Sequence, residues 1–205
     1  TDRKLYIFSE GKVYDITPLR ETQALTNPFA TSSGSATVTV TDSGHNAEVG
    51  AFVTFDNGSS TNVVDGIDFN AEFEILTVPT GNTFTINAGT NASGTTAAGG
   101  GSVTATYQIN PGPTSSTYGY GWGTETWGAS TWDEPRSSSN VVVEGRNWSL
   151  DNFGEDLIAT VLNGGTFIWD TSSSFGTRAT ALSNAPTASR FSLVSTDTRH
   201  LLIFG

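Results

Sequence analysis

Ala36-Thr37-Val38-Thr39-Val40-Thr41 alternates apolar residues with threonine at every second position. In an extended strand this period puts Ala36, Val38 and Val40 on one face and the three threonines on the other. Similar short runs, separated by Gly- and Asn-containing turns, follow at residues 51–55, 69–76, 83–86 and 103–109. Strands of this kind bury their apolar faces by curling around a shared core. The sequence therefore predicts a small five-stranded β-barrel over residues 31–109.

The rest of the chain predicts β-hairpins. No stretch of eleven or more residues has helical apolar spacing free of Gly, Pro or β-branched clusters. Residues 4–8 and 13–17 flank a Gly-containing turn, Asn163-Gly164-Gly165 marks a second hairpin, and residues 191–204 supply a third. Hairpins that recur in this way are typical of propeller blades. We therefore predict an all-β fold: partial β-propeller-like hairpin repeats with an inserted small five-stranded β-barrel.

Three parts follow from these patterns. Residues 1–30 form a propeller-like hairpin, residues 31–109 form the inserted barrel, and residues 110–205 contain an aromatic, Gly-rich linker followed by further propeller-like hairpins. The third part continues the body that residues 1–30 begin. Inside the barrel, residues 87–101 are rich in Gly, Ala and Thr, which is typical of a flexible surface loop.

Charge and composition argue against several classes of function. Nine basic and twenty acidic side chains give a net charge of −11, which disfavours non-specific binding to the phosphate backbone of nucleic acid. No apolar run approaches the length of a membrane-spanning helix, so we predict no membrane span. The absence of Cys excludes disulfides, thiolate metal sites and cysteine catalysis.

Candidate catalytic and metal-binding residues are few. His45 and His200 stand in unlike surroundings, and we interpret both as structural or solvated. Two carboxylate pairs are present, Asp133-Glu134 and Glu155-Asp156. A glycosidase needs two carboxyl groups at a defined distance in space, which a sequence does not give, so we prefer to interpret both pairs as solvated loop charges. Asp56-Asn57-Gly58 offers two oxygen donors without an acidic closing ligand, which favours a plain turn over a calcium site. We predict no catalytic, cofactor-binding or metal-binding residue.

The most distinctive segment is aromatic. Tyr118, Tyr120, Trp122, Trp127 and Trp132 lie among glycines, at spacings that match neither a strand nor a helix. Exposed rings of this kind can bind a glycan or a protein partner, because they offer a large contact area at low entropic cost. The alternative is that the rings fill gaps between β-modules. We prefer this second interpretation because neighbouring Gly residues let backbones approach closely.

Several segments of the sequence resemble a known protein family. These segments are residues 4–8, 13–20, 118–123, 127–132 and 146–157. They are similar to tail proteins of short-tailed bacteriophages, namely the hub, nozzle or packaged-DNA stabilisation proteins below the portal. This resemblance implies a β-propeller body of more than 205 residues, of which the chain is a part. Residues 38–86 are similar to a small β-barrel inserted into many phage tail proteins, in which the His before Val49-Gly50 is structural. The family has no shared catalytic residue.

The leading hypothesis is therefore a structural virion protein of a bacteriophage tail, without enzymatic activity. Copies would form a hub or nozzle ring with other tail and portal-adaptor proteins, and DNA would pass an acidic inner wall without specific binding. The alternative is a receptor- or glycan-binding β-module of a phage tail or of a secreted surface protein. A wall-degrading hydrolase that uses Asp133 and Glu134 is the least favoured hypothesis.

Overall fold

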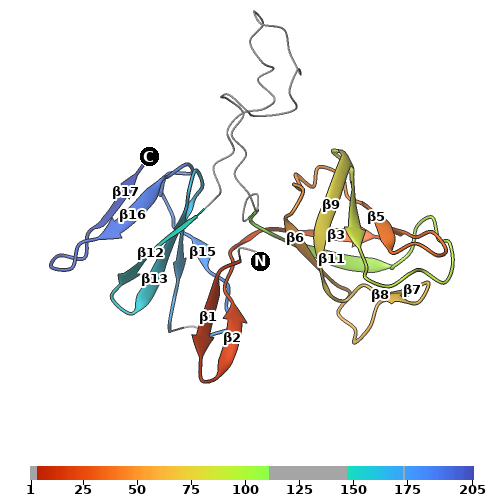
Figure 1. Cartoon of the computed structure of the whole chain (residues 1–205), viewed down its shortest axis with the longest axis horizontal. Coiled ribbons are helices and arrows are strands. Elements are labelled where there is room, and N and C mark those ends of the chain that lie inside the picture. The colour runs from red at the N-terminus through yellow and green to blue at the C-terminus, as the bar shows by residue number, and fades with distance from the viewer. Residues whose placement is uncertain (1–3, 111–146, 173) are drawn as a thin grey trace, which may run out of the picture. The chain divides into compact units, whose positions relative to one another are not determined.

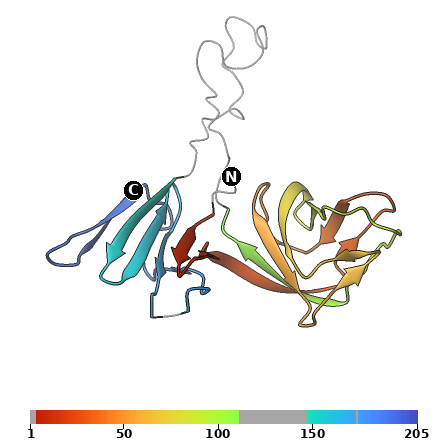
Figure 2. The ribbon, with the colours of Figure 1, turned by 60° about the horizontal axis from the view of Figure 1, so that its bottom comes forward.

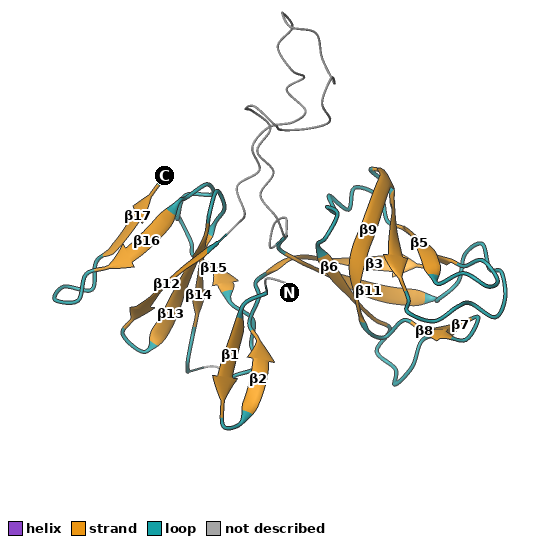
Figure 3. Ribbon diagram, in the orientation of Figure 1, coloured by secondary structure: helices purple, strands orange, loops and turns teal. Residues whose placement is uncertain are grey.

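The computed structural model describes residues 4–110, 147–172 and 174–205. These residues form strands and loops, with no helix among them, so the prediction of an all-β fold is confirmed (Figure 3). In particular, none of the described segments is a helix suited to cross a membrane. The chain divides into two compact units (Figure 1). Of the described residues, the barrel unit comprises residues 4–110, 167–172 and 174–181, and the hairpin unit comprises residues 147–166 and 182–205.

The barrel is one antiparallel sheet that curls around its core (Figure 2). Its order is β3-β11-β6-β9-β10-β5-β4. The strands are β3 (Leu19–Thr26), β4 (Phe29–Ala30), β5 (Thr37–Thr41), β6 (Phe52–Asp56), β9 (Glu72–Thr80), β10 (Thr83–Asn87) and β11 (Ser102–Gln108). The five runs predicted from alternation correspond to β5, β6, β9, β10 and β11.

The sheet closes because one strand bends. β3 pairs with β11 and β4 pairs with β5, so the two edges of the sheet are consecutive pieces of chain. Between them Asn27 adopts a positive φ of 50° and Pro28 follows, which turns the strand from one neighbour to the other. The two terminal strands of the sheet order, β3 and β4, are thus joined through this bend.

The expected barrel start at residue 31 and the expected count of five strands need correction. The sheet has seven strands and begins at Leu19. Residues 19–26 mix Arg20, Glu21 and Gln23 with apolar residues, and the strand buries none of its side chains fully. Its alternation was therefore weak in the sequence, although its ladder with β11 is long.

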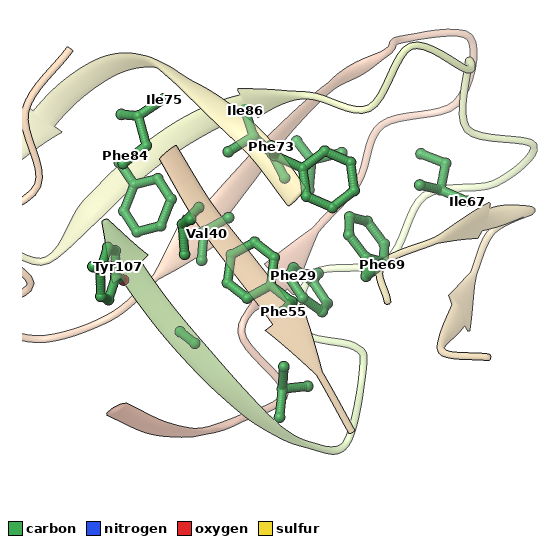
Figure 4. Close-up of a cluster of buried hydrophobic side chains, with 14 of the residues drawn as sticks. Phe29, Val40, Phe55, Ile67, Phe69, Phe73, Ile75, Phe84, Ile86 and Tyr107 are labelled. Carbon is green, nitrogen blue, oxygen red and sulfur yellow. The ribbon is translucent and has the colours of Figure 1, made fainter. Parts of the chain in front are cut away.

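The interior of the barrel holds the side chains that alternation predicted. Val38 and Val40 are fully buried, whereas Thr37 and Thr41 are exposed. Phe29 stacks on Phe69 with ring centroids 3.8 Å apart, and it meets Phe55 edge to face at 5.0 Å (Figure 4). The cluster contains Phe29, Val38, Val40, Ala51, Val53, Phe55, Ile67, Phe69, Phe73, Ile75, Phe84, Ile86, Ala92, Val103, Ala105 and Tyr107.

The segment expected to be a flexible surface loop, residues 87–101, is largely exposed, and it is anchored to the barrel at single points. Ala92 is buried in the core, and its N–H donates to the carbonyl of Ser35 at 2.9 Å. Ser93 N–H donates at 2.8 Å to the carbonyl of Asp65, which lies in the turn between β7 (Val63–Val64) and β8 (Ile67–Asp68). These contacts hold the segment against the barrel at Ala92 and Ser93, and its flexibility stays a prediction.

A node of backbone hydrogen bonds lies where the chain enters and leaves the barrel. The N–H of Ile109 donates to the carbonyl of Pro18 at 3.0 Å, so the two connections lie side by side. Just before Pro18 comes the hairpin of β1 (Tyr6–Ser9) and β2 (Lys12–Asp15). Ile16 accepts at 3.0 Å from the N–H of Ala179, which lies between β14 (Thr166–Trp169) and β15 (Thr180–Ala181). Residues 163 positions apart, Ile16 and Ala179, therefore meet in this node.

The hairpin unit contains two ladders, β12 (Trp148–Phe153) with β13 (Asp156–Val161) and β16 (Phe191–Val194) with β17 (Leu201–Phe204). β16 packs on β12 through polar contacts: Val194 N–H donates to Asp151 Oδ2 at 2.7 Å, and Ser149 Oγ donates to the carbonyl of Ser192 at 3.1 Å. The hairpins predicted at residues 4–17 and 191–204 are thus present. Their membership of a propeller, and the continuation of one body from residues 1–30 into 110–205, stay predictions.

Candidate assembly surfaces

The five aromatic residues predicted as a partner or glycan contact lie outside the described residues. They are Tyr118, Tyr120, Trp122, Trp127 and Trp132. Asp133 and Glu134 also lie outside them. Roles for these side chains therefore stay predictions.

His45 is a structural residue of the barrel. Its side chain is buried, and its ring meets Phe84 edge to face at 5.1 Å. Nδ1 accepts from the N–H of Ala47 at 2.8 Å, and Nε2 lies 3.2 Å from the carbonyl of Thr80. A neutral imidazole protonated on Nε2 satisfies both contacts. His200, in the hairpin unit, is exposed, and its Nδ1 contacts the hydroxyl of Thr198 at 2.6 Å.

The oxygen donors of Asp56-Asn57-Gly58 serve the turn itself. Asp56 Oδ1 accepts from the N–H of Gly58 at 2.7 Å. Asn57 Oδ1 accepts from the N–H of Ser59 and from Nδ2 of Asn70, each at 2.9 Å. In the part of the chain that the structure describes, no three His, Asp or Glu side chains are grouped to hold a metal ion.

Two aspartates, Asp65 and Asp68, act as acceptors in loops and turns of the barrel unit. Hydrogen bonds from the hydroxyls of Thr31 and Thr96 lower the pKa of Asp65. Backbone N–H groups of Asn62 and Asn70 lower the pKa of Asp68 in the same way. A low pKa suits an ionised acceptor that shapes a loop, and it does not suit a general acid at neutral pH.

The hairpin unit carries an exposed apolar face on β16 and β17. Phe191 lies directly opposite Phe204, and Leu193 lies directly opposite Leu202. These four side chains are between 43% and 50% exposed, and the two phenyl rings stack with centroids 4.6 Å apart. The other face of β16 is covered, because Ser192 and Val194 are buried. The hairpin therefore buries one face within its unit and leaves an apolar face outward.

The β1–β2 hairpin of the barrel unit carries a second apolar surface. Phe8 lies directly opposite Val13 in the ladder, and these side chains are 72% and 65% exposed. Tyr6, two residues before Phe8 on the same face of β1, is 43% exposed. Cross-strand apolar pairs of this kind stabilise a sheet most when a neighbouring layer covers them.

Sequence reasoning identified these hairpins but not their exposed faces. One signal was present: Leu201-Leu202-Ile203-Phe204 is apolar at every position, as in strands covered on both faces. Which of the two faces its own unit covers depends on the packing of β16 against β12, and this packing has no local signature.

Comparison with known proteins gives few relatives. No protein-family model and no curated protein matches the chain. Among solved structures the chain is similar to the Phage phi92 endosialidase, with a TM-score of 0.39 and 18% sequence identity. The match covers 80% of this chain and 24% of that chain, so the chain spans about a quarter of the endosialidase's length. The functional proposals therefore rest on the residues and contacts of this chain.

Proposed function

We propose that this chain is a structural virion protein of a bacteriophage tail, in a hub or nozzle ring that seals and extends the DNA conduit. Its partners are copies of itself and other tail or portal-adaptor proteins, and its place is the virion. The segments that resemble tail proteins of short-tailed phages support this function, and so does the all-β fold. The proposed role needs no enzymatic activity and no cofactor.

One observation carries the proposal: the β16–β17 hairpin presents an outward apolar face. Phe191, Leu193, Leu202 and Phe204 form two directly opposed pairs with no charged residue between them. Contiguous apolar patches on soluble proteins mark surfaces that bind other proteins. A protein that works by assembly needs such faces, because apolar burial drives most association.

The charge of the barrel suits a conduit component. Residues 19–110 contain eight carboxylates and a single cationic side chain, Arg20. The phosphate backbone of DNA is repelled by such a surface, so DNA would pass without being held.

The test is the state of association of the purified chain. We expect the wild-type protein to self-associate as its concentration rises in sedimentation velocity experiments. The double variant Phe191→Ser, Phe204→Ser should stay monomeric and folded, with a melting temperature lowered only slightly by the loss of the stacked rings. Leu150→Ser is the matched control, because Leu150 is a similarly exposed residue of β12 in the same unit. Monomeric wild-type protein at every concentration, together with its absence from purified phage particles, would reject the proposal.

Receptor binding through the Trp-rich segment is the alternative function, and a glycan array decides it. Binding by the wild-type chain that disappears in a Trp122→Ala, Trp127→Ala, Trp132→Ala variant would replace the structural proposal. Absence of binding by both chains would leave packing as the role of these rings.

A further inference from the structure

A cluster of four charged side chains lies at the node where the chain enters and leaves the barrel. We call Lys4, Asp15, Glu72 and Arg178 the ion cluster. Lys4 Nζ contacts Glu72 Oε1 and lies 3.6 Å from Asp15 Oδ2. Arg178 Nη1 lies 2.7 Å from Asp15 Oδ1, and Arg178 Nη2 lies 3.9 Å from Glu72 Oε2. Two cations and two carboxylates thus balance one another.

The cluster is partly withdrawn from water, so its members depend on one another. The side chain of Lys4 is 4% exposed, and its ammonium lies 4.0 Å above the ring centroid of Phe52 on β6. Gln108 of β11, itself buried, donates from Nε2 to Glu72 Oε2. A buried ammonium without its carboxylate partner is costly, which ties Lys4 to Glu72.

Glu72 is the one charged member of the cluster that the barrel supplies. It begins β9, whereas Lys4 and Asp15 belong to the β1–β2 hairpin and Arg178 to the segment between β14 and β15. The covalent links from the barrel to these segments are the two adjacent stretches at Pro18 and Ile109. These two stretches lie side by side, and the ion cluster joins the barrel to the same segments at a further place.

We propose that the ion cluster is a clasp that fixes the orientation of the barrel on the β1–β2 hairpin. Removing the charge of Glu72 would let the barrel swing about the links at residues 18–19 and 108–110 while staying folded. Buried ion pairs contribute little net stability and can select one arrangement among several, which agrees with this role. The inference concerns this node alone and does not depend on the tail function.

The test uses spin labels, because the chain contains no Cys and accepts unique ones. Lys12→Cys places a label at the hairpin tip, and Ser59→Cys places one on an exposed barrel loop. Pulsed dipolar spectroscopy should give a narrow distance distribution in the otherwise wild-type chain. Glu72→Gln should broaden the distribution at least about twofold, and Glu74→Gln, an exposed residue two positions along β9, should leave it narrow.

Arg178→Gln provides a second arm, because Arg178 lies outside the barrel strands and its loss should not disturb the barrel core. This variant should broaden the distribution as well. Circular dichroism and thermal melting show in each case whether the barrel is folded. A narrow distribution in folded Glu72→Gln and Arg178→Gln chains, or a broad one in the wild type, would overturn the proposal.

Discussion

Tyr107 shows how one buried polar side chain is tied to its surroundings. It is 1% exposed, and its hydroxyl donates to Asp42 Oδ2 at 2.5 Å. The guanidinium of Arg20 lies 5.1 Å from the centroid of its ring. Burial, and then the hydrogen bond to the Asp42 carboxylate, raise the pKa of Tyr107 well above its ordinary value.

The first prediction follows from this pKa. In the unfolded chain Tyr107 loses its proton near pH 10, whereas in the folded barrel it stays protonated. Its contribution to the free energy of unfolding is therefore fully present below about pH 10 and falls by about 1.4 kcal/mol per pH unit above it. Urea denaturation at pH 8 and pH 11 should show this loss in the wild type and a smaller loss in Tyr107→Phe. Equal losses in the two proteins would contradict it.

Gly100 gives a second prediction at the level of single residues. Its φ is +101°, and an added Cβ would lie 2.5 Å from Cδ2 of the core residue Phe29. We expect Gly100→Ala to lower the free energy of unfolding by about 2–4 kcal/mol, through backbone strain and displacement of Phe29.

Gly89→Ala is the matched control for this prediction. Gly89 also has a positive φ, +69°, but an added Cβ would meet nothing within 4 Å. The free energy of unfolding of this variant should fall by only about 1 kcal/mol, because the change adds backbone strain and no steric contact. Similar losses for the two variants in urea denaturation would show that the contact with Phe29 has no effect.

At the level of elements, hydrogen bonds between side-chain hydroxyl groups connect β16 to its neighbours in the hairpin unit. Thr160 Oγ1, on β13, donates to Ser192 Oγ at 2.8 Å and lies 3.0 Å from the hydroxyl of Thr166. All three residues are buried. Since hydroxyl groups are directional, this network fixes the position of β16 more tightly than apolar contacts of equal size would.

Thr160→Val is the prediction for this element. It keeps the volume of the side chain and leaves the hydroxyls of Ser192 and Thr166 without their partner. It should reduce the free energy of unfolding by about 1–3 kcal/mol. Thr160→Ser keeps the hydroxyl, so its free energy of unfolding should fall by less than that of the valine variant. Hydrogen exchange of the Val194 amide should speed up only in the valine variant, and an unchanged rate there would argue against the network.

Alternation predicted elements well wherever one face is buried. Val38 and Val40, and likewise Phe84 and Ile86, point into the core from strands that the sequence placed within a residue or two. β3 was missed because it contains Arg20, Glu21 and Gln23 and buries no side chain fully. The burial of Ala92 within residues 87–101 was not predicted, because small residues are equally typical of an exposed loop and of a packed one.

At the level of the whole molecule, the barrel has the properties of an independent folding unit. Its sixteen core residues all lie between Phe29 and Tyr107. Its strands β3 and β11 pair along a ladder, and the hydrogen bond from Ile109 to Pro18 lies next to that ladder. We therefore expect an excised fragment of residues 17–110 to fold by itself, with strand-type circular dichroism and one cooperative urea transition.

A control for the fragment is Phe69→Ala, which removes the ring stacked on Phe29 and should lower its stability by about 3–5 kcal/mol. A fragment that stays unfolded would mean that the barrel needs the node at Lys4, Asp15 and Arg178 for folding and not only for orientation.

The sequence by itself determined the all-β class, most of the barrel strands and the faces they bury, because alternation along a strand is a local property that the pleat imposes. It also excluded disulfides, through the absence of Cys. Only the tertiary structure decided the rest. Closure at Asn27-Pro28, the ion cluster and the outward face of β16–β17 depend on which distant segments meet. These long-range contacts arise because the whole chain buries its apolar surface and pairs its strands, so no short stretch of the sequence predicts them.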